Sequence, residues 1–220
     1  MTHPQARILV VDDERNIRKT LSIVLEAVGY QVDTASDGEE ALDKIKEQHY
    51  DIAFVDLHMP RLGGLELLRL VRGLSEETAV VILTAYGSVA YAVEAMKLGA
   101  VDFLEKPFDP KTIQLLAEEM LLRQRLGSNG SEGSVEDLLH LAELARGRHA
   151  PTEARAYLKT AMLRDATRPE PYYWLGFLYE SEGNIRQAMH YYSMALEVHH
   201  TFQPAREALT LLERKNSTPR

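Results

Sequence analysis

The chain has 220 residues, of which 45% are hydrophobic and 26% are charged. These proportions are those of an ordinary globular protein, so they exclude wholesale disorder, and the length allows one large domain or two small ones. The absence of cysteine excludes a disulfide scaffold, a thiolate zinc site and a cysteine nucleophile.

No segment approaches the roughly 20 consecutive apolar residues that a membrane-spanning helix needs. The first residues, Met-Thr-His-Pro-Gln-Ala-Arg, lack the apolar core of a signal peptide. We therefore expect a cytoplasmic protein with no membrane partner.

The net charge is −8, and it is unevenly distributed. Residues 1–126 contain 14 basic and 21 acidic side chains, whereas residues 127–220 contain 11 and 12. Neither part is the strongly basic module that neutralises the phosphates of a nucleic acid. This balance disfavours a nucleic-acid partner.

Short β-branched or apolar runs alternate with amphipathic stretches over residues 1–126. We expect strands at Ile8–Val11, Val32–Ala35, Ile52–Val55, Val80–Leu83 and Val101–Leu104. We expect helices at about Glu14–Val28, Glu39–Glu47, Leu65–Leu74, Val89–Leu98 and Lys111–Arg125. This alternation predicts an α/β domain with a five-stranded, doubly wound parallel sheet, whose ligands bind at the carboxyl ends of the strands.

Polar residues follow four of these expected strands. They are Asp12 and Asp13 after the first strand, Asp56 after the third, Thr84 after the fourth and Lys106 after the fifth. Three carboxylates in one pocket repel each other and need a cation, and hard oxygen donors suit Mg²⁺. A metal, a free carboxylate, a hydroxyl and an ammonium together indicate phosphoryl chemistry.

This pattern resembles the receiver domain of bacterial two-component response regulators, which has a flavodoxin-like fold, and the resemblance covers residues 1–126. It implies that Asp56 accepts a phosphoryl group from a sensor histidine kinase and that Thr84 and Lys106 bind that group. It further implies that Mg²⁺ is held by Asp12, Asp13, Asp56 and the backbone carbonyl of His58. Each residue alone has an ordinary alternative, such as a turn or a helix cap, and the joint pattern favours the receiver.

The resemblance implies further features of the receiver. Phe103, three residues before the lysine, takes the place of the aromatic switch residue that acts together with Thr84, although a core position is the alternative. A cis peptide bond is expected between Lys106 and Pro107. We expect no enzyme, because such a receiver takes part only in its own phosphorylation and dephosphorylation, and the resemblance allows a homodimer through it. We expect His58 and Tyr86 to restrict the hydrolytic water and prolong the phosphorylated state.

A flexible linker is expected at residues 127–134, where three glycines and three serines cluster. The next part, residues 135–214, has no strand pattern and repeats itself at a shift of 34 residues, before a short tail at 215–220. It resembles tetratricopeptide repeats. We expect two units, Val135–Arg168 and Pro169–Phe202, and a capping helix at Ala205–Glu213.

In the tetratricopeptide family one helix face lines a groove for peptide ligands. The corresponding residues here are Tyr173, Phe177 and Glu180 in the second unit, Leu139, Glu143 and Arg146 in the first, and Glu207 and Leu211 in the cap. We expect the two aromatic residues to anchor a downstream partner protein. The alternative is that they pack against the first unit or against the receiver.

The interpretation is a response regulator with a protein-binding helical output, and alternatives remain open. The helices could instead bind nucleic acid, mediate dimerisation alone, or form a phosphotransfer module of a phosphorelay. The last alternative lacks support because the residues after His140 do not include the expected basic residue and glycine. The segment Asp102–Phe108 resembles receivers that carry an ATPase and a DNA-binding helix pair, but this chain has no Walker loop.

Overall fold

The computed structural model describes residues 6–74, 77–85, 89–127 and 133–217, and side chains up to residue 214. The chain forms two compact units, Met1–Leu121 and Leu122–Arg220, which we describe separately. The boundary falls within helix α5, and most of the predicted linker, like the end of the predicted tail, lies outside the described residues. None of the described helices is long and apolar enough to cross a bilayer.

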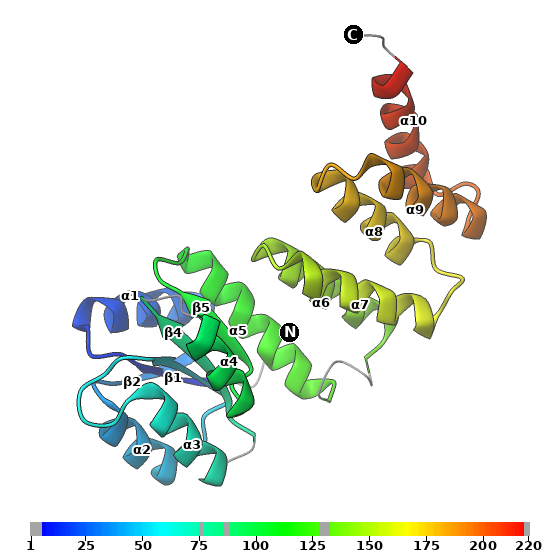
Figure 1. Ribbon diagram of the computed structural model, residues 1–220. Helices are drawn as coiled ribbons and strands as arrows, with labels where there is room; N and C mark the ends of the chain where they lie inside the picture. Colours follow the sequence, from blue (N-terminus) through cyan, green and yellow to red (C-terminus); the bar gives the residue numbers. More distant parts are fainter. Residues whose placement is uncertain (1–5, 75–76, 86–88, 128–132, 218–220) are drawn as a thin grey trace. The chain divides into compact units, whose positions relative to one another are not determined.

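The first unit is built on a five-stranded parallel sheet (Figure 1). Its strands are β1 (Arg7–Val11), β2 (Gln31–Ala35), β3 (Ile52–Asp56), β4 (Ala79–Thr84) and β5 (Asp102–Glu105). The order β2-β1-β3-β4-β5 makes β1 an interior strand with β3, β4 and β5 on one side of it. The predicted fold class is therefore confirmed, with strand ends within two residues of the expected positions.

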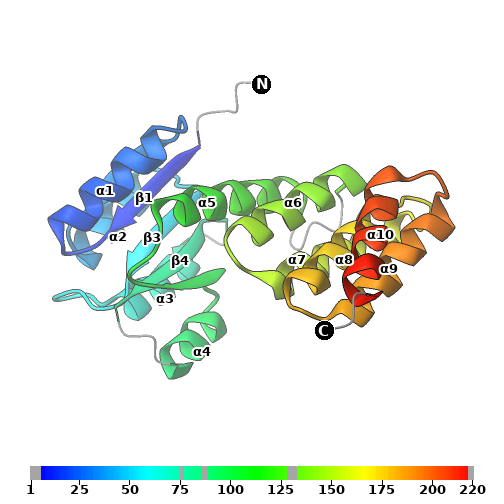
Figure 2. The same ribbon diagram turned by 90° about the horizontal axis from the view of Figure 1, so that it is seen from above.

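Helices cover both faces of this sheet (Figure 2). They are α1 (Arg15–Glu26), α2 (Gly38–Glu47), α3 (Gly64–Leu74), α4 (Val89–Lys97) and α5 (Pro110–Arg125). Alternate residues of a strand face opposite sides, so Leu9 packs with α2, α3 and α4, whereas Ile8 packs with α1 and α5. This alternation divides the core into two apolar layers and fixes the register of the strand ends.

The second unit contains only helices among its described residues. They are α6 (Val135–Gly147), α7 (Pro151–Arg164), α8 (Glu170–Ser181), α9 (Ile185–Val198) and α10 (Gln203–Ser217). The bounds of α9 follow those of α7 at a distance of 34 residues, and α8 ends 34 residues after α6. Neighbouring helices pack as the pairs α6–α7 and α8–α9, and α10 packs against α9.

The packing of α8 against α9 depends on a glycine. A Cβ at Gly176 of α8 would lie 2.6 Å from the ring of Tyr192 on α9, so only a residue without a side chain fits. The hydroxyl of Tyr192 donates a hydrogen bond of 2.7 Å to Glu180. Burial and this bond raise the pKa of Tyr192 well above its usual range, so the phenol stays protonated and serves as a donor.

Gly176→Ala should lower the free energy of unfolding of the helical unit by about 1 kcal/mol. Two effects oppose each other. The added methyl group overpacks the α8–α9 contact, which costs about 1–3 kcal/mol, whereas the higher helix propensity of alanine over glycine stabilises by about 1 kcal/mol, so a net loss is expected. Chemical denaturation followed by far-UV circular dichroism, which reports the helices of both units, measures the change. The control is Gly73→Ala, at an exposed position near the end of α3 in the first unit, where a Cβ meets nothing within 4 Å. Equal stabilisation by both changes would contradict this account of the α8–α9 contact.

Candidate functional site

Four predicted site residues meet at the carboxyl edge of the sheet. Asp12 follows β1, Asp56 ends β3, Thr84 ends β4 and Lys106 follows β5, and these strands are neighbours in the sheet. Asp12 and Thr84 have no exposed surface, and Asp56 is 5% exposed. The parallel register thus brings residues up to 94 positions apart into one buried cluster.

Lys106 joins the two buried carboxylates. Its ammonium Nζ donates hydrogen bonds of 2.6 Å to Asp12 Oδ2 and of 2.6 Å to Asp56 Oδ1. The backbone N–H of Lys106 donates to the carbonyl of Thr84, and the peptide bond that follows, to Pro107, is cis. The lysine side chain is only 12% exposed, so this ion-paired triad lies almost entirely out of water.

Burial and charge act against each other in this triad. Burial raises the pKa of Asp12, and the bonds from Lys106 and from the Glu14 backbone only partly offset it. Burial lowers the pKa of Lys106, but its hydrogen bonds to Asp12 and Asp56 outweigh burial and leave that pKa raised. The lysine therefore keeps its positive charge at neutral pH, between groups that would repel each other without it.

Backbone groups bind the other carboxylate oxygens. Asp56 Oδ2 accepts a bond of 2.8 Å from the N–H of His58, and Asp12 Oδ1 accepts one of 2.8 Å from Glu14. Gly64, the first residue of α3, approaches the Asp56 carbonyl so closely that a Cβ could not be placed there. Both carboxylates are therefore held in defined orientations by the turns that follow their strands.

The donor set fits a magnesium ion on two of the predicted ligands. Asp12 and Asp56 already share one cation, the Lys106 ammonium, so they are close enough to face a second. Asp13 is exposed beside them. Within the described ranges no three His, Asp or Glu side chains converge as a ready-made metal cluster. Mg²⁺ requires no such cluster, because it is usually bound by one or two carboxylates and keeps several waters.

Two arginines that we did not predict from the sequence shape the loops around the site. Arg18 of α1 donates a hydrogen bond of 2.6 Å to the backbone carbonyl of Asp12 and one of 3.0 Å to that of Asp13. Arg61, which has a positive φ of 66°, pairs with the buried Asp37 that caps α2. No local motif marks these arginines, because their partners lie on other turns.

Other predicted residues surround the triad less closely. Phe103 is partly buried and packs against the core layer that contains α2, α3 and α4. His58 meets the ring of Tyr91 on α4 edge to face, with centroids 5.5 Å apart. Tyr86 lies outside the described residues. The loop after Asp56 is thus in contact with α4, which carries exposed apolar residues such as Val89 and Met96.

The predicted partner-binding residues of the helical unit separate into two groups. Tyr173 packs within the second repeat, against Trp174, Tyr192 and Phe202. Glu180 accepts the bond from Tyr192 described above. These contacts place Tyr173 and Glu180 in the internal packing of the unit.

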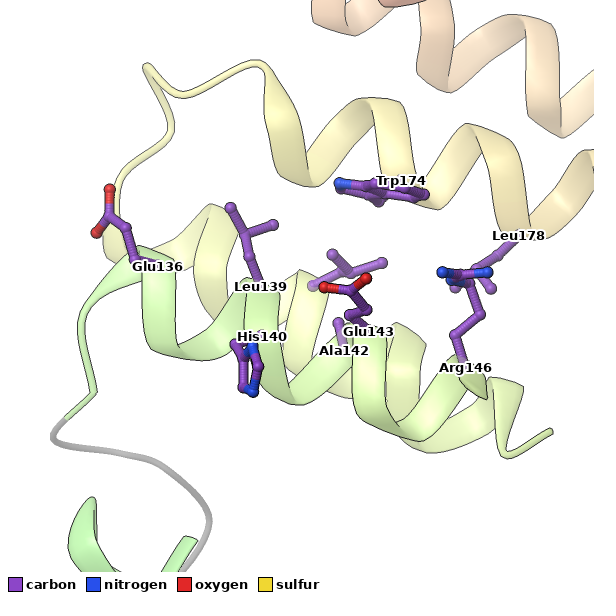
Figure 3. A pocket seen from close by; sticks show the side chains of 9 residues that line it. Glu136, Leu139, His140, Ala142, Glu143, Arg146, Trp174 and Leu178 are labelled. Atoms are coloured by element: carbon purple, nitrogen blue, oxygen red, sulfur yellow. The ribbon is translucent and has the colours of Figure 1, made fainter. Parts of the chain in front are cut away.

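The other group lies at a pocket between α6 and α8 (Figure 3). Leu139, Glu143 and Arg146 line it, and the guanidinium of Arg146 is 5.7 Å from the ring of Phe177. Trp174 lies across the pocket opposite these residues. Sequence reasoning gave Trp174 no role, although as the single tryptophan, beside Tyr173 in a helix, it was a visible candidate.

Comparisons with known proteins agree with the geometry of the first unit. Residues 8–118 match the family model of the response regulator receiver domain. The chain therefore belongs to the response regulator receiver family.

The relatives extend well beyond the part of them that this chain matches. The chain is 39% identical to the transcriptional regulatory protein ZraR of Klebsiella oxytoca over 129 residues, 59% of this chain and 29% of ZraR. It is 44% identical to the response regulator MprA of Mycobacterium tuberculosis over 119 residues, 54% of this chain and 49% of MprA. A solved receiver domain protein from Clostridium thermocellum is 35% identical, with a TM-score of 0.53, covering 55% of this chain and 98% of that one.

Lys106→Met should lower the free energy of unfolding by about 3 kcal/mol in magnesium-free buffer, because it leaves two buried carboxylates without a countercharge. Adding Asp12→Asn should recover about half of that loss, since only one buried charge then remains. Denaturant titration measures both variants. Lys97→Met, on the exposed side of α4, is the control and should change stability by less than about 0.5 kcal/mol. A double variant no more stable than Lys106→Met would contradict the triad account.

Proposed function

We propose that the first unit accepts a phosphoryl group on Asp56 from a sensor histidine kinase. The observation that carries the proposal is the buried triad, in which a carboxylate, a second carboxylate and an ammonium converge at the sheet edge. In the transfer an Asp56 oxygen forms a bond to phosphorus while the phosphorus–nitrogen bond of the donor phosphohistidine breaks. The receiver acts only on itself in this scheme, in its phosphorylation and dephosphorylation.

The residues of the site have distinct roles in this transfer. Asp12, Asp13, Asp56 and the carbonyl of His58 would hold Mg²⁺, which when bound neutralises phosphoryl oxygens. Lys106 moves its hydrogen bond from Asp56 to a phosphoryl oxygen and so keeps its charge compensated. The hydroxyl of Thr84 donates to another phosphoryl oxygen, and Phe103 responds from the same side of the sheet as α4.

The proposed output is a tetratricopeptide-like unit that binds another protein. Its support is the 34-residue spacing of helix bounds, together with the small residues Gly176 and Ala188 at buried positions of α8 and α9. Two helix pairs and a further helix stack in sequence, and the pocket lies between the first helices of the two pairs.

A DNA-binding output is the second candidate, because relatives such as ZraR are named transcriptional regulators. The charges of this chain favour the protein-binding output. Arg148, Arg155 and Arg168 of the helical unit are each paired with a glutamate, so they do not form a free basic face. Phosphate binding would require such a face.

Wild-type protein should take up one phosphoryl group from acetyl phosphate in the presence of Mg²⁺, and Asp56→Asn should take up none. The reason is that the amide of asparagine is not a nucleophile toward phosphorus. Phosphate-affinity electrophoresis measures the uptake, and chelation of Mg²⁺ with EDTA should stop it.

Asp43→Asn is the matched control for that experiment, since Asp43 has a 75% exposed side chain on α2, and its uptake should equal that of the wild type. Base-labile phosphate on Asp56→Asn at the wild-type rate would show that another residue is the acceptor.

The phosphorylated protein should show no retention of mixed duplex DNA in mobility-shift assays at 50 mM salt. A site that neutralises several phosphates would bind strongly at 50 mM and lose about 10³–10⁵ in affinity at 200 mM, whereas the 11 basic side chains of residues 127–220 are balanced by 12 acidic ones. Sequence-dependent retention at 200 mM salt would favour the DNA-binding output instead.

A further inference from the structure

The pocket between α6 and α8 is lined by both apolar and charged side chains (Figure 3). Leu158 and Leu178 form its buried floor, and Leu139 and the indole of Trp174 flank it. Its volume is about 270 Å³, below the range of roughly 300–1,000 Å³ typical of small-molecule sites. That space suits one or two side chains of a peptide better than a whole cofactor.

Arg146 is a basic residue of this lining and is held by aromatic rings. Its guanidinium carbon lies 5.4 Å from the ring centre of Trp174 and 5.7 Å from that of Phe177. Across the described ranges the side chain of Arg146 makes no hydrogen bond or ion pair, so ring contacts fix it while its guanidinium N–H donors remain available. A fixed guanidinium with available donors is well arranged to bind a carboxylate through two parallel hydrogen bonds.

The two carboxylates at the pocket limit the charge of a ligand. Glu136 is already paired with Arg168, at 2.6 Å. The side chain of Glu143 is exposed, and its carboxylate makes no hydrogen bond or ion pair with any described residue. The available guanidinium, that of Arg146, can pair with one negative charge, and the Glu143 carboxylate repels a phosphate dianion more strongly than a single carboxylate. The charges therefore favour a ligand with one carboxylate.

We propose that this pocket binds a peptide segment of a partner protein that carries one aliphatic or aromatic side chain and one nearby carboxylate. The apolar side chain packs between Leu139 and Trp174, and the carboxylate accepts hydrogen bonds from Arg146. The proposal rests on the protein-binding output proposed above and adds the chemistry of the bound segment.

The test is an array of alanine hexapeptides with capped ends. Each peptide carries one apolar residue (Leu, Met or Phe) and one polar residue (Glu, Gln or Lys), and zero to three alanines separate these two residues. The full chain is titrated with each peptide, and the fluorescence of Trp174, the single tryptophan, reports binding at the pocket itself. The best Glu peptide should bind about tenfold more tightly than its Gln counterpart, and the Lys counterpart should bind more weakly still.

Three variants locate the interaction. Arg146→Gln should weaken the best Glu peptide about tenfold and remove its preference over the Gln peptide. Glu143→Gln should strengthen the Glu peptide, because it removes a repelling charge. Arg155→Gln is the matched control and should change nothing, since Arg155 also lies over a ring, that of Tyr179 at 5.8 Å, but outside the pocket. Thermal unfolding checks that each variant is folded.

The proposal is overturned if no peptide prefers Glu over Gln, if the Lys peptides bind best, or if folded Arg146→Gln binds the Glu peptide like the wild type. Binding of a purified partner protein to the helical unit distinguishes failure of this proposal from failure of the proposed protein-binding function. If a partner bound equally well to the wild type and to Arg146→Gln, the proposed protein-binding output would stand. The proposal that Arg146 binds a carboxylate of the partner would be wrong.

Discussion

The site of the first unit depends on one interaction, the pairing of the Lys106 ammonium with the buried carboxylates of Asp12 and Asp56. Two carboxylates out of water would repel each other and cost several kcal/mol without a countercharge. The lysine reaches both because β5 lies two strands from β3 in the same parallel sheet. The chemistry of the site thus follows from strand order, and the turn that holds Asp56 admits only a glycine at position 64.

The helical unit holds its key cation differently. Lys106 has its donors satisfied by carboxylates and can exchange one of them for a phosphoryl oxygen. Arg146 is fixed by the faces of Trp174 and Phe177, and its donors are available to a ligand. The first arrangement suits a site that changes state on modification, and the second suits a site that recognises a partner. Both fit a protein that receives a signal in one unit and passes it on from another.

The pattern of the sequence was sufficient to predict the fold of the first unit and the residues of the triad. Parallel strands end at one edge, so residues after successive strands must meet, and each of Asp12, Asp56 and Lys106 stands at such an end. The loop contacts of Arg18 and Arg61 could not be predicted, because long side chains reach partners on other turns. Within the helices, the 3.6-residue period predicted which residues share a helix face. It could not predict which aromatic ring would line the pocket, so the position of Trp174 there was not predicted.

The central claim is that Asp56, within the Lys106 triad, is the residue that carries the phosphoryl group. Borohydride reduction of the phosphorylated protein converts an aspartyl phosphate to homoserine, and peptide mass mapping then locates it without any substitution. The account predicts homoserine at position 56 alone, and only after incubation with Mg²⁺ and a phosphoryl donor. Homoserine at another aspartate, or acid-labile phosphate on a histidine such as His140 with residue 56 unmodified, would contradict it.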